Sequence, residues 1–398
     1  MAELPLKDIT VIDFATLIAG PGVATFLGDF GAKVIKVEQP HVGDPMRGKL
    51  FFEDGRSPIW LNESRNKKTV TLNLKTPEGQ EIARQLAAQA DVVLMNFRPG
   101  QAEAWNLGPD DLHQTNPDLI VVLVSAYGQS GPLSKKGGFD RTASAFAGTT
   151  YVTGYPDRPP VRPGYAMVDY MTGYLGAFGV MTALYNRDAK GGSGEVIDLT
   201  LIEAAFRSSE SALMDFSMNG RIRERTGNRN PHFVPAEDFE TKDGKILVIN
   251  AGTESLWKKL AHCMGQPELI EDPRFDNTVN RIMNQNELYE IMAEWVKQLT
   301  AEEGLNILDA AGVPADTIRN IEDLVNEPHM RARDAIVEVD DPQKGGVLVP
   351  GVFPKLKNSP GKIQFLGPKL GEYNHEIYHD LLGIPLEELA ELEKKGAI

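Results

Sequence analysis

The N-terminal third of the chain alternates short β-type runs with helical patterns, and this alternation constrains the fold more than any other feature. The helical patterns lie at 22–30 and from Pro77 onward. The β-type runs are 9–14, 33–38, 68–74, 91–97 and 119–128. Strands separated by helices form βαβ units, which place their strands parallel in one sheet. We therefore predict an α/β fold.

Ligand sites in parallel sheets lie beyond the carboxyl ends of the strands. Four segments follow strand ends and are expected to contribute to a site: 14–22, 38–44, 96–100 and 125–140. Glycine-rich turns and helix starts in such segments can bind anionic ligands through backbone N–H groups. The active site is predicted at this edge of the sheet.

A dinucleotide-type motif is suggested by Gly20-Pro21-Gly22, with Glu38 at the end of the next strand. Thr25 stands where that motif has Gly or Ala, and Gly20 lies too far beyond the first strand for a tight phosphate turn. We therefore do not predict a nicotinamide site. An anionic ligand facing this helix start remains open.

The second half of the chain has a different pattern. Residues 195–216 are predicted as a strand that runs into a long helix, and the polar stretch 219–235 as a linker. Residues 244–314 contain a strand and several helices, and the chain ends with β-type segments from Ala335 onward and a charged helix. An apolar stripe at helical spacing is interpreted as core; it consists of Leu288, Ile291, Met292 and Trp295.

Charge and targeting features exclude several classes of protein. The 398 residues contain 41 Lys and Arg against 56 Asp and Glu, a formal net charge of −15, which disfavours nucleic acid and anionic membranes as partners. The N-terminus resembles no signal peptide, and no apolar run is long enough to span a bilayer. A single cysteine, Cys263, fits a reducing compartment, so a cytoplasmic protein with a packed thiol is expected.

Motifs along nearly the whole chain resemble one family. They are Gly20-Pro21 and the segments 28–40, 66–79, 90–100, 125–140, 168–184, 194–205 and 366–378. Together they resemble the class III CoA-transferases of the CaiB/BaiF type, a group that includes formyl-CoA and carnitine CoA-transferases and α-methylacyl-CoA racemases. The resemblance implies a large Rossmann-like domain made of the N-terminal half plus the C-terminal tail, with a smaller α+β domain inserted.

The implied domain boundaries follow from that resemblance. Residues 1–205 and 326–398 would form the large CoA-binding domain, 206–225 a linker helix and 226–325 the small domain. In this family two such chains form an interlocked homodimer, so a second copy of the chain is an expected partner.

Asp169 is the leading catalytic candidate. It starts an apolar helical run in which Gly173, Gly176 and Gly179 share one face, which leaves room for a ligand or another helix. A carboxylate at a helix N-terminus is expected to stay ionised at neutral pH, and an ionised carboxylate can attack a thioester carbonyl. An N-cap role alone would also explain an aspartate there.

The resemblance assigns Asp169 the catalytic role. It would attack an acyl-CoA to give a mixed anhydride, then an aspartyl-CoA thioester that an acceptor carboxylate resolves, with acyl-CoA and a small carboxylic acid as substrates. This exchange needs no metal or prosthetic group. Backbone N–H groups of Gly137 and Gly138 are candidate oxyanion donors. Asp140 matches an acidic family position and would orient the site, although an ion pair with Arg141 would also explain it.

CoA carries phosphates, so local basic residues must oppose the negative average charge. The basic candidates are Lys67, Lys68, Lys75, Arg98, Lys135 and Lys136. By resemblance, the CoA-binding residues are Ile18, Leu72, Asn73, Lys75, Asn96, Phe97, Arg98, Lys136 and Gly137. Gln39 and Ala104 depart from the family, which often has basic residues at both positions.

Two other functions remain as alternatives. A racemase would pair the aspartate with a histidine base, but Phe139 occupies the position expected for that histidine and cannot move a proton. A catalytically silent CoA-binding protein would not need Asp169. Formate or oxalate specificity is disfavoured because residues 230–253 lack a run of four glycines, and His232 and Glu254 have no assigned role.

Overall fold

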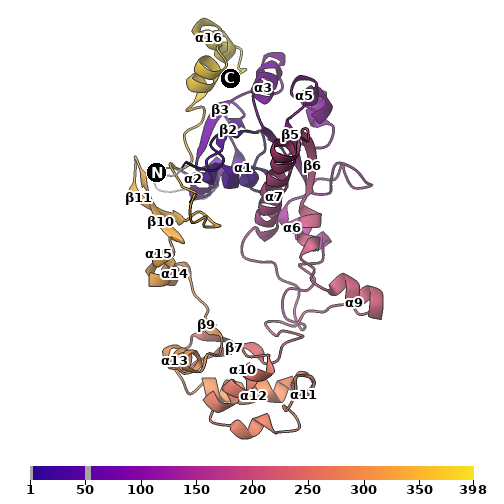
Figure 1. Cartoon of the computed structure of the whole chain (residues 1–398), viewed down its shortest axis with the longest axis vertical. Helices are drawn as coiled ribbons and strands as arrows, with labels where there is room; N and C mark the ends of the chain where they lie inside the picture. The colour runs from indigo at the N-terminus through magenta and orange to yellow at the C-terminus, as the bar shows by residue number, and fades with distance from the viewer. Residues whose placement is uncertain (1–2, 50–54) are drawn as a thin grey trace. The chain divides into compact units, whose positions relative to one another are not determined.

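The computed structural model describes residues 3–49 and 55–398, and the chain forms two compact units (Figure 1). Unit 1 contains Met1–Thr149, Pro163–Leu213 and His329–Ile398. Unit 2 contains Thr150–Arg162 and Met214–Pro328. The N-terminal half and the C-terminal tail therefore share unit 1.

A six-stranded parallel sheet forms the centre of unit 1. The strands are β1 (Thr10–Asp13), β2 (Lys33–Glu38), β3 (Lys67–Thr71), β4 (Val92–Met95), β5 (Ile120–Ser125) and β6 (Glu195–Thr200). Their order, β3-β2-β1-β4-β5-β6, is that of doubly wound nucleotide-binding sheets, with the switch point between β1 and β4. The predicted α/β class and parallel strands are confirmed.

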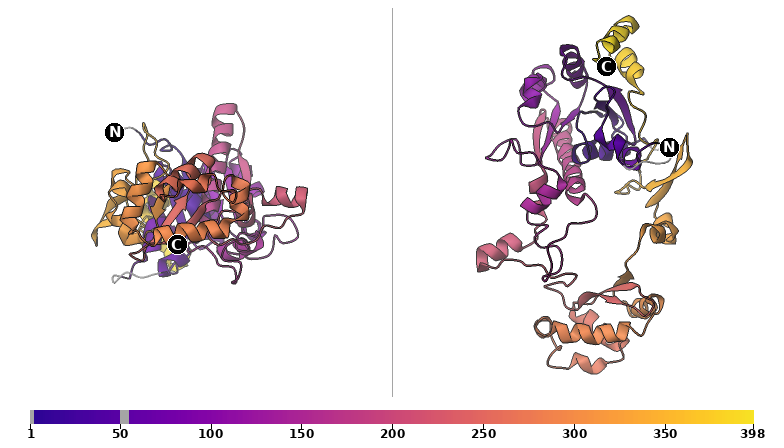
Figure 2. Two further views of the ribbon diagram at one scale, coloured as in Figure 1. Left: turned by 90° about the horizontal axis from the view of Figure 1, so that it is seen from below. Right: turned by 180° about the vertical axis from the view of Figure 1, so that it is seen from behind.

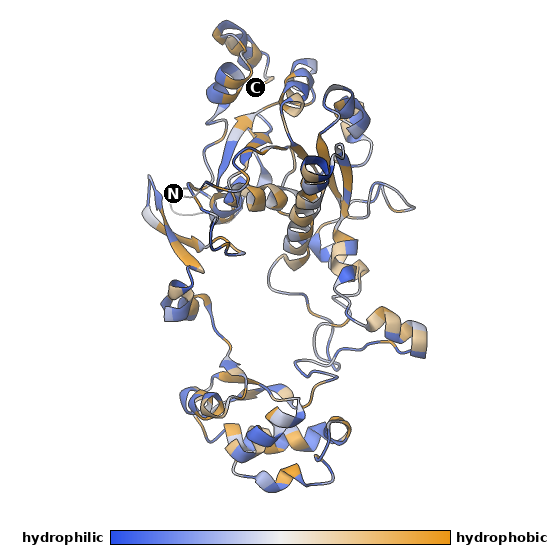
Figure 3. Cartoon of the chain, viewed as in Figure 1, coloured by the Kyte–Doolittle hydropathy of each residue, from blue (hydrophilic) through white to orange (hydrophobic). Residues whose placement is uncertain are grey.

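Helices cover both faces of this sheet (Figures 1 and 2). One face packs against α1 (Ala19–Asp29), α7 (Met167–Lys190) and α8 (Leu201–Arg207). The other packs against α3 (Pro77–Ala88), α5 (Pro109–Thr115), the π-helix η3 (His375–Leu381) and α16 (Leu386–Lys394). Shorter elements are η1 (Pro45–Gly48), α2 (Pro58–Glu63), α4 (Gln101–Ala104) and α6 (Asp140–Phe146). The central strands are hydrophobic because both their faces are buried (Figure 3).

The C-terminal tail of unit 1 is attached to the edge strand β3. It begins with α15 (Pro328–Ala332) and a hairpin of β10 (Ile336–Asp341) and β11 (Gly345–Pro350). Farther on, the Tyr373 N–H donates to the Thr69 carbonyl at 3.0 Å, and the last residues bond to the loop after β3. These contacts connect both ends of the chain in one unit.

Unit 2 is a small α+β unit. Its antiparallel sheet has the order β7 (Ala236–Glu240), β8 (Ile246–Asn250), β9 (Ala315–Thr317). Its helices are α10 (Glu254–Cys263), η2 (Pro267–Ile270), α11 (Thr278–Met283), α12 (Gln285–Val296), α13 (Ala301–Ala311) and α14 (Ile321–Asn326). The predicted apolar stripe on α12 belongs to this core: Leu288 and Met292 are fully buried, and Ile291 and Trp295 pack against them.

One helix prediction is wrong. The strand β6 runs into α8, but that helix ends at Arg207, and a separate helix, α9, spans Ala212–Asn219. Serines at 208, 209 and 211 compete with helical hydrogen bonding, and Glu210 has a φ of 52°. The run is therefore broken by a turn.

Two further sequence features have structural outcomes. The Cys263 thiol is half-buried against the core of unit 2, and burial raises its pKa, as expected for a packed thiol. Across residues 3–49 and 55–398, none of the helices combines the length and the apolar character needed to cross a membrane.

Candidate active site

The loops after β1, β4 and β5 converge on a cleft of about 250 Å³ in unit 1. It is lined by Thr16–Ala19, Asn96–Pro99, Val124–Ala126, Ser134–Phe139, Asp169 and Leu201. A smaller cleft of about 110 Å³ shares Thr16 and Phe97 with it and extends to the ends of β2 and β3. Both clefts lie where the parallel sheet predicted a site, beyond the carboxyl ends of the strands.

Asp169 reaches the larger cleft because of helix packing. Atoms of α1 lie against Gly173: an added Cβ would stand 3.5 Å from the Ala19 carbonyl oxygen and 3.2 Å from the Phe26 ring. At Gly176 it would stand 2.6 Å from Val23. The glycine face of α7 therefore contacts a helix, which places Asp169 beside the start of α1.

Asp140 caps the helix that carries Asp169. α7 has no side-chain cap of its own at Ala166, and the Asp140 carboxylate accepts hydrogen bonds from the N–H groups of Val168, at 2.8 Å, and Asp169, at 3.3 Å. These are two of the N–H groups that a helix leaves unpaired at its start. In the described part of the chain, no ion pair joins Asp140 to Arg141; instead Asp140 positions the start of α7.

Burial changes the charge state expected for Asp169. Desolvation, with a smaller contribution from the Asp140 charge, raises the pKa of Asp169 to about 7. Within residues 3–49 and 55–398 its carboxylate accepts no hydrogen bond from another side chain or from the backbone. At neutral pH Asp169 is therefore about half ionised rather than fully ionised as the helix N-terminus predicts, because Asp140 already uses two of the available N–H groups and burial removes water.

The loop between β1 and α1 is held in a strained conformation. Leu17 has a φ of 70°, a region that side chains with Cβ atoms rarely adopt. Its N–H faces the Asp44 carboxylate at 3.3 Å, and the Asn96 side chain both accepts from the Thr16 N–H, at 2.9 Å, and donates to the Thr16 carbonyl, at 2.8 Å. Asn96 therefore shapes the wall of the cleft through the backbone of Thr16.

The structure groups most, but not all, of the expected CoA-binding residues. Those that line the larger cleft with Asp169 are Ile18, Asn96, Phe97, Arg98, Lys136 and Gly137. Leu72 and Lys75 line the smaller cleft. Asn73 lines neither, because its side chain donates to the Gly396 carbonyl at 3.1 Å and accepts from the Lys75 N–H.

Basic residues near the clefts divide into paired and available groups. Lys67 is fully buried, lies 3.0 Å from Asp13 and donates to the Pro21 carbonyl; burial lowers its pKa. Lys68 pairs with Glu376. Arg98, Lys135 and Lys136 line the larger cleft, and Lys75 the smaller one. These four are therefore the candidates for binding phosphate.

Sequence reasoning missed the buried charges that support the loop after β1. Lys36 is 1 % exposed, lies 3.2 Å from Asp44 and 3.8 Å from Asp13, and donates to the Ala15 carbonyl. Opposite charges at these distances raise the pKa of Lys36 despite burial. A lysine in the middle of strand β2, between Ile35 and Val37, was the available signal.

The remaining candidates have local partners. Glycines 20 and 22 lie inside α1 and do not form a turn before it, so the dinucleotide-type motif is not built. Glu254 pairs with the buried Arg281 at 2.7 Å, which lowers the pKa of Glu254. The N–H of His232 donates to the Asn230 side chain at 2.9 Å.

Comparisons with known proteins agree across the chain. The model of CoA-transferase family III matches residues 6–374. A succinyl-CoA–D-citramalate CoA-transferase from Chloroflexus aurantiacus is 41 % identical over 396 residues, 99 % of this chain and 98 % of that protein. The succinyl-CoA–L-malate CoA-transferase beta subunit of the same organism is 42 % identical over 399 residues, with the same coverage. The crystal structure of a CAIB/BAIF family protein from Brucella suis superposes with a TM-score of 0.84 at 31 % identity and covers 96 % of this chain and 100 % of that one.

Proposed function

The chain belongs to CoA-transferase family III, and on that premise we propose that it moves CoA from succinyl-CoA to a small dicarboxylic acid, with Asp169 as the covalent carrier. The observation that carries this proposal is the Asp169 carboxylate, which has no hydrogen-bond partner among the described residues and lines a cleft whose wall also has basic side chains. The two relatives are named for succinyl-CoA as donor and for D-citramalate and L-malate as acceptors.

The first half of the reaction forms a covalent enzyme. The Asp169 carboxylate attacks the thioester carbonyl of the donor. The C–S bond breaks, CoA leaves as a thiolate, and a mixed anhydride of Asp169 and succinate forms. The thiolate then attacks the aspartyl carbonyl, so that free succinate leaves and Asp169 holds CoA as a thioester. A carboxylate with a raised pKa is a stronger nucleophile, and one with a pKa of about 7 is still half ionised at neutral pH.

The second half repeats these steps in reverse. The acceptor carboxylate attacks the aspartyl thioester, the thiolate leaves, and its attack on the acceptor side of the new anhydride gives the product acyl-CoA and restores Asp169. Each step has an oxyanion that needs hydrogen-bond donors. Gly137 and Gly138 line the cleft, and among the described residues neither of their N–H groups donates to a backbone carbonyl.

Positive charge at the cleft supports binding of CoA. Arg98, Lys135 and Lys136 line the larger cleft, and Lys75 lines the smaller one. Phosphate groups interact favourably with such side chains, and Arg can form two parallel hydrogen bonds to them. We assign the phosphates of CoA to these four residues.

Racemization is not favoured by the cleft. Phe139 lies on its wall with 66 % of its surface exposed, and no histidine is among the described residues that line it. Proton exchange at a carbon next to a thioester requires a base as well as an acid, and Phe139 supplies neither.

We also propose that two copies of the chain associate. One side of α7 exposes Tyr174, Leu175, Phe178, Met181 and Tyr185, and α9 exposes Leu213, Met214, Phe216 and Met218. Apolar surface of this extent is unusual for a chain that stays single in water. The interlocked homodimer of this family would cover it, and sedimentation equilibrium should then give twice the chain mass of 43.7 kDa.

The proposal is tested by measuring CoA transfer from succinyl-CoA or acetyl-CoA to L-malate, D-citramalate and monocarboxylic acids. Asp169→Asn should lose transfer, whereas Asp188→Asn, a change of an exposed carboxylate on the same helix, should keep it. Hydroxylamine should trap CoA-loaded wild type as a hydroxamate at Asp169, found by peptide mass spectrometry. Full transfer by Asp169→Asn would overturn the covalent mechanism, and transfer to other acids alone would overturn the acceptor class.

A further inference from the structure

The C-terminal tail of unit 1 contains a π-helical turn, η3, which is far from the cleft residues in the sequence. Its wide turn shows in the hydrogen bond from the Leu382 N–H to the Ile377 carbonyl, five residues back, at 3.1 Å. π-helical turns are rare and occur often at functional sites. The side chains that this turn presents are therefore of interest.

The π-helical geometry brings three possible metal ligands together. In an α-helix each residue advances by about 100°, so positions i+4 and i+5 lie about 40° and 140° from position i. With roughly 4.4 residues per turn, a π-helix places those positions about 30° behind and about 50° ahead of position i. His379 and Asp380 thus lie on either side of His375, whereas an α-helix would turn Asp380 away.

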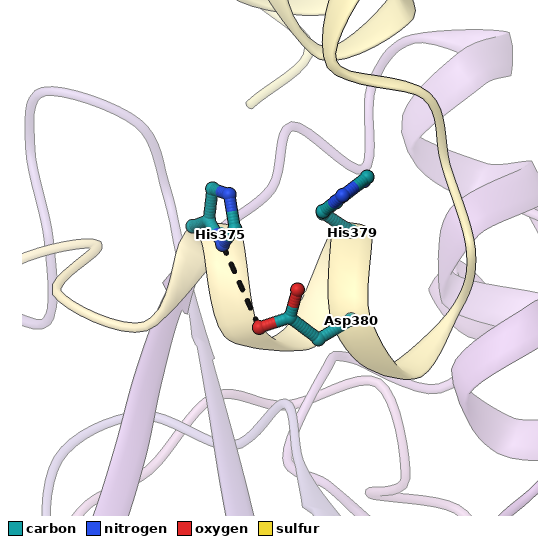
Figure 4. Close-up of side chains that lie close together, drawn as sticks. All are labelled: His375, His379 and Asp380. Atoms are coloured by element: carbon teal, nitrogen blue, oxygen red, sulfur yellow. Dashed lines mark ion pairs between the residues drawn. The ribbon is translucent and has the colours of Figure 1, made fainter.

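The three side chains are close together; His375 and Asp380 are exposed and His379 is half-buried. The possible ligand atoms of His375, His379 and Asp380 all lie within 4.8 Å of one another. Figure 4 shows the Asp380 carboxylate below the two histidine rings in that view, with its Oδ2 3.6 Å from Nδ1 of His375. The two rings pack edge to face, with their centroids 5.0 Å apart.

One histidine is already oriented for binding. Nδ1 of His379 lies 2.8 Å from the Ile384 carbonyl oxygen. A carbonyl oxygen only accepts, so Nδ1 must carry the proton and Nε2 keeps its lone pair. Metal-binding histidines in proteins are commonly held in this way, by a hydrogen bond from the nitrogen that does not bind the metal.

We propose that His375, His379 and Asp380 form a binding site for a divalent transition-metal ion of the Zn²⁺ type. Two imidazoles and a carboxylate suit Zn²⁺, Co²⁺ or Ni²⁺, whereas Ca²⁺ and Mg²⁺ prefer oxygen ligands. Bonds of about 2.1 Å in a tetrahedron place ligand atoms about 3.4 Å apart, so atoms that now lie up to 4.8 Å apart must approach by up to about 1.4 Å. The partly exposed side chains can move this far, and water completes the coordination.

The backbone below the site is firmly held. Tyr378 is fully buried and its hydroxyl donates to the Thr71 carbonyl at 2.8 Å, and Ile377 is 4 % exposed. The neighbouring Glu376 is used by Lys68. A bound ion would therefore cross-link three side chains within the wide turn of η3, next to strand β3. The CoA-transfer chemistry needs no metal, so this site is independent of the proposed reaction.

The test is calorimetric titration of the chelator-treated full-length protein with Zn²⁺ alone. Wild type should bind one ion per chain, and His375→Gln and His379→Gln should each weaken binding at least tenfold. Asp380→Asn keeps the His379 hydrogen bond and should also weaken binding, which separates loss of a ligand from loss of the turn. Far-UV circular dichroism checks that each variant is folded.

Matched controls come from unit 2, where a histidine is followed in the sequence by a cysteine, which is also a possible metal ligand. His262→Gln and Cys263→Ser in unit 2 should leave the affinity unchanged. Zn²⁺ should also raise the melting temperature of wild type but not of the His375→Gln/His379→Gln double variant. Absence of saturable 1:1 binding, or undiminished binding by the double variant, would overturn the proposal, and neither result would bear on CoA transfer.

Discussion

Replacing Asp169 with Asn should stabilise unit 1 at neutral and alkaline pH. The carboxylate is largely buried, has no hydrogen-bond donor among the described residues, and lies near Asp140, so its ionised form is unfavourable in the folded protein. Asparagine has almost the same shape and no charge. The substitution therefore removes an electrostatic cost and leaves the packing of α7 in place.

The size of the effect follows from the pKa. The pKa of Asp169 is about 7 when folded, against 3.8 for an unperturbed aspartate. Below pH 3.8 both states are protonated and the cost is absent; between pH 3.8 and about 7 the unfolded state releases its proton first, so stability falls as pH rises. At about 1.4 kcal/mol per pKa unit, the cost is about 2 kcal/mol at pH 5 and reaches about 4 kcal/mol above pH 7.

Hydrogen exchange is the appropriate measurement, because two units can unfold in separate steps and a single melting curve would mix them. Exchange of α7 amides, followed by mass spectrometry at pH 5 and pH 8, reports the opening free energy of unit 1. Asp169→Asn should gain more protection at pH 8 than at pH 5, by up to about 3 kcal/mol.

Asp140→Asn is the informative companion variant. It removes a charge near Asp169 but also weakens the cap on α7, so it should lose about 1 kcal/mol of stability where Asp169→Asn gains. An Asp169→Asn protein that is no more stable than wild type at pH 8, or whose advantage is the same at both pH values, would refute the assignment of a costly charge to this position.

Three further outcomes follow from the same structure. Transfer rates (kcat/KM) should fall about tenfold per pH unit below about pH 7, and Asp140→Asn should move this limb to lower pH; a limb near pH 4 in wild type would contradict the raised pKa of Asp169. Urea denaturation should show that Gly176→Ala costs about 1–3 kcal/mol, because its Cβ would meet the buried Val23 at 2.6 Å and the half-buried Leu199 at 2.7 Å, whereas Gly179→Ala on the same face, with 3.6 Å of room, should gain about 0.5 kcal/mol. Arg281→Met should cost unit 2 about 3 kcal/mol, measured by tryptophan fluorescence, since this fully buried guanidinium holds two backbone carbonyls and a carboxylate.

Much of the fold could be predicted from local sequence pattern. The central strands β4 and β5 are almost wholly apolar because both faces of the sheet are covered there, and both strands end where the site begins. The break between α8 and α9 was missed because apolar residues lie on both sides of the polar run 207–211, as they would in one continuous helix. There, the backbone preferences of Ser208, Ser209 and Glu210 outweigh helical periodicity.

The sequence predicted which residues line the site better than it predicted which groups those residues contact. Asn96 was expected beside a ligand and does line the cleft, but its amide is committed to the backbone of Thr16. Lys67 was expected among the phosphate ligands and is instead buried against Asp13. Both outcomes depend on contacts between residues more than 50 positions apart, which no local pattern records.

The charge state of Asp169 also depends on contacts and burial that local sequence pattern does not record. A helix N-terminus and a glycine face are visible in the sequence, but the burial they produce, and the use of the α7 N–H groups by Asp140, arise only in the folded chain. Nucleophilic attack needs an ionisable carboxylate in a place that excludes water, and excluding water makes the ionised form costly. The stability that Asp169→Asn should recover is therefore the folding free energy that this chain gives up to keep a reactive carboxylate at the end of its cleft.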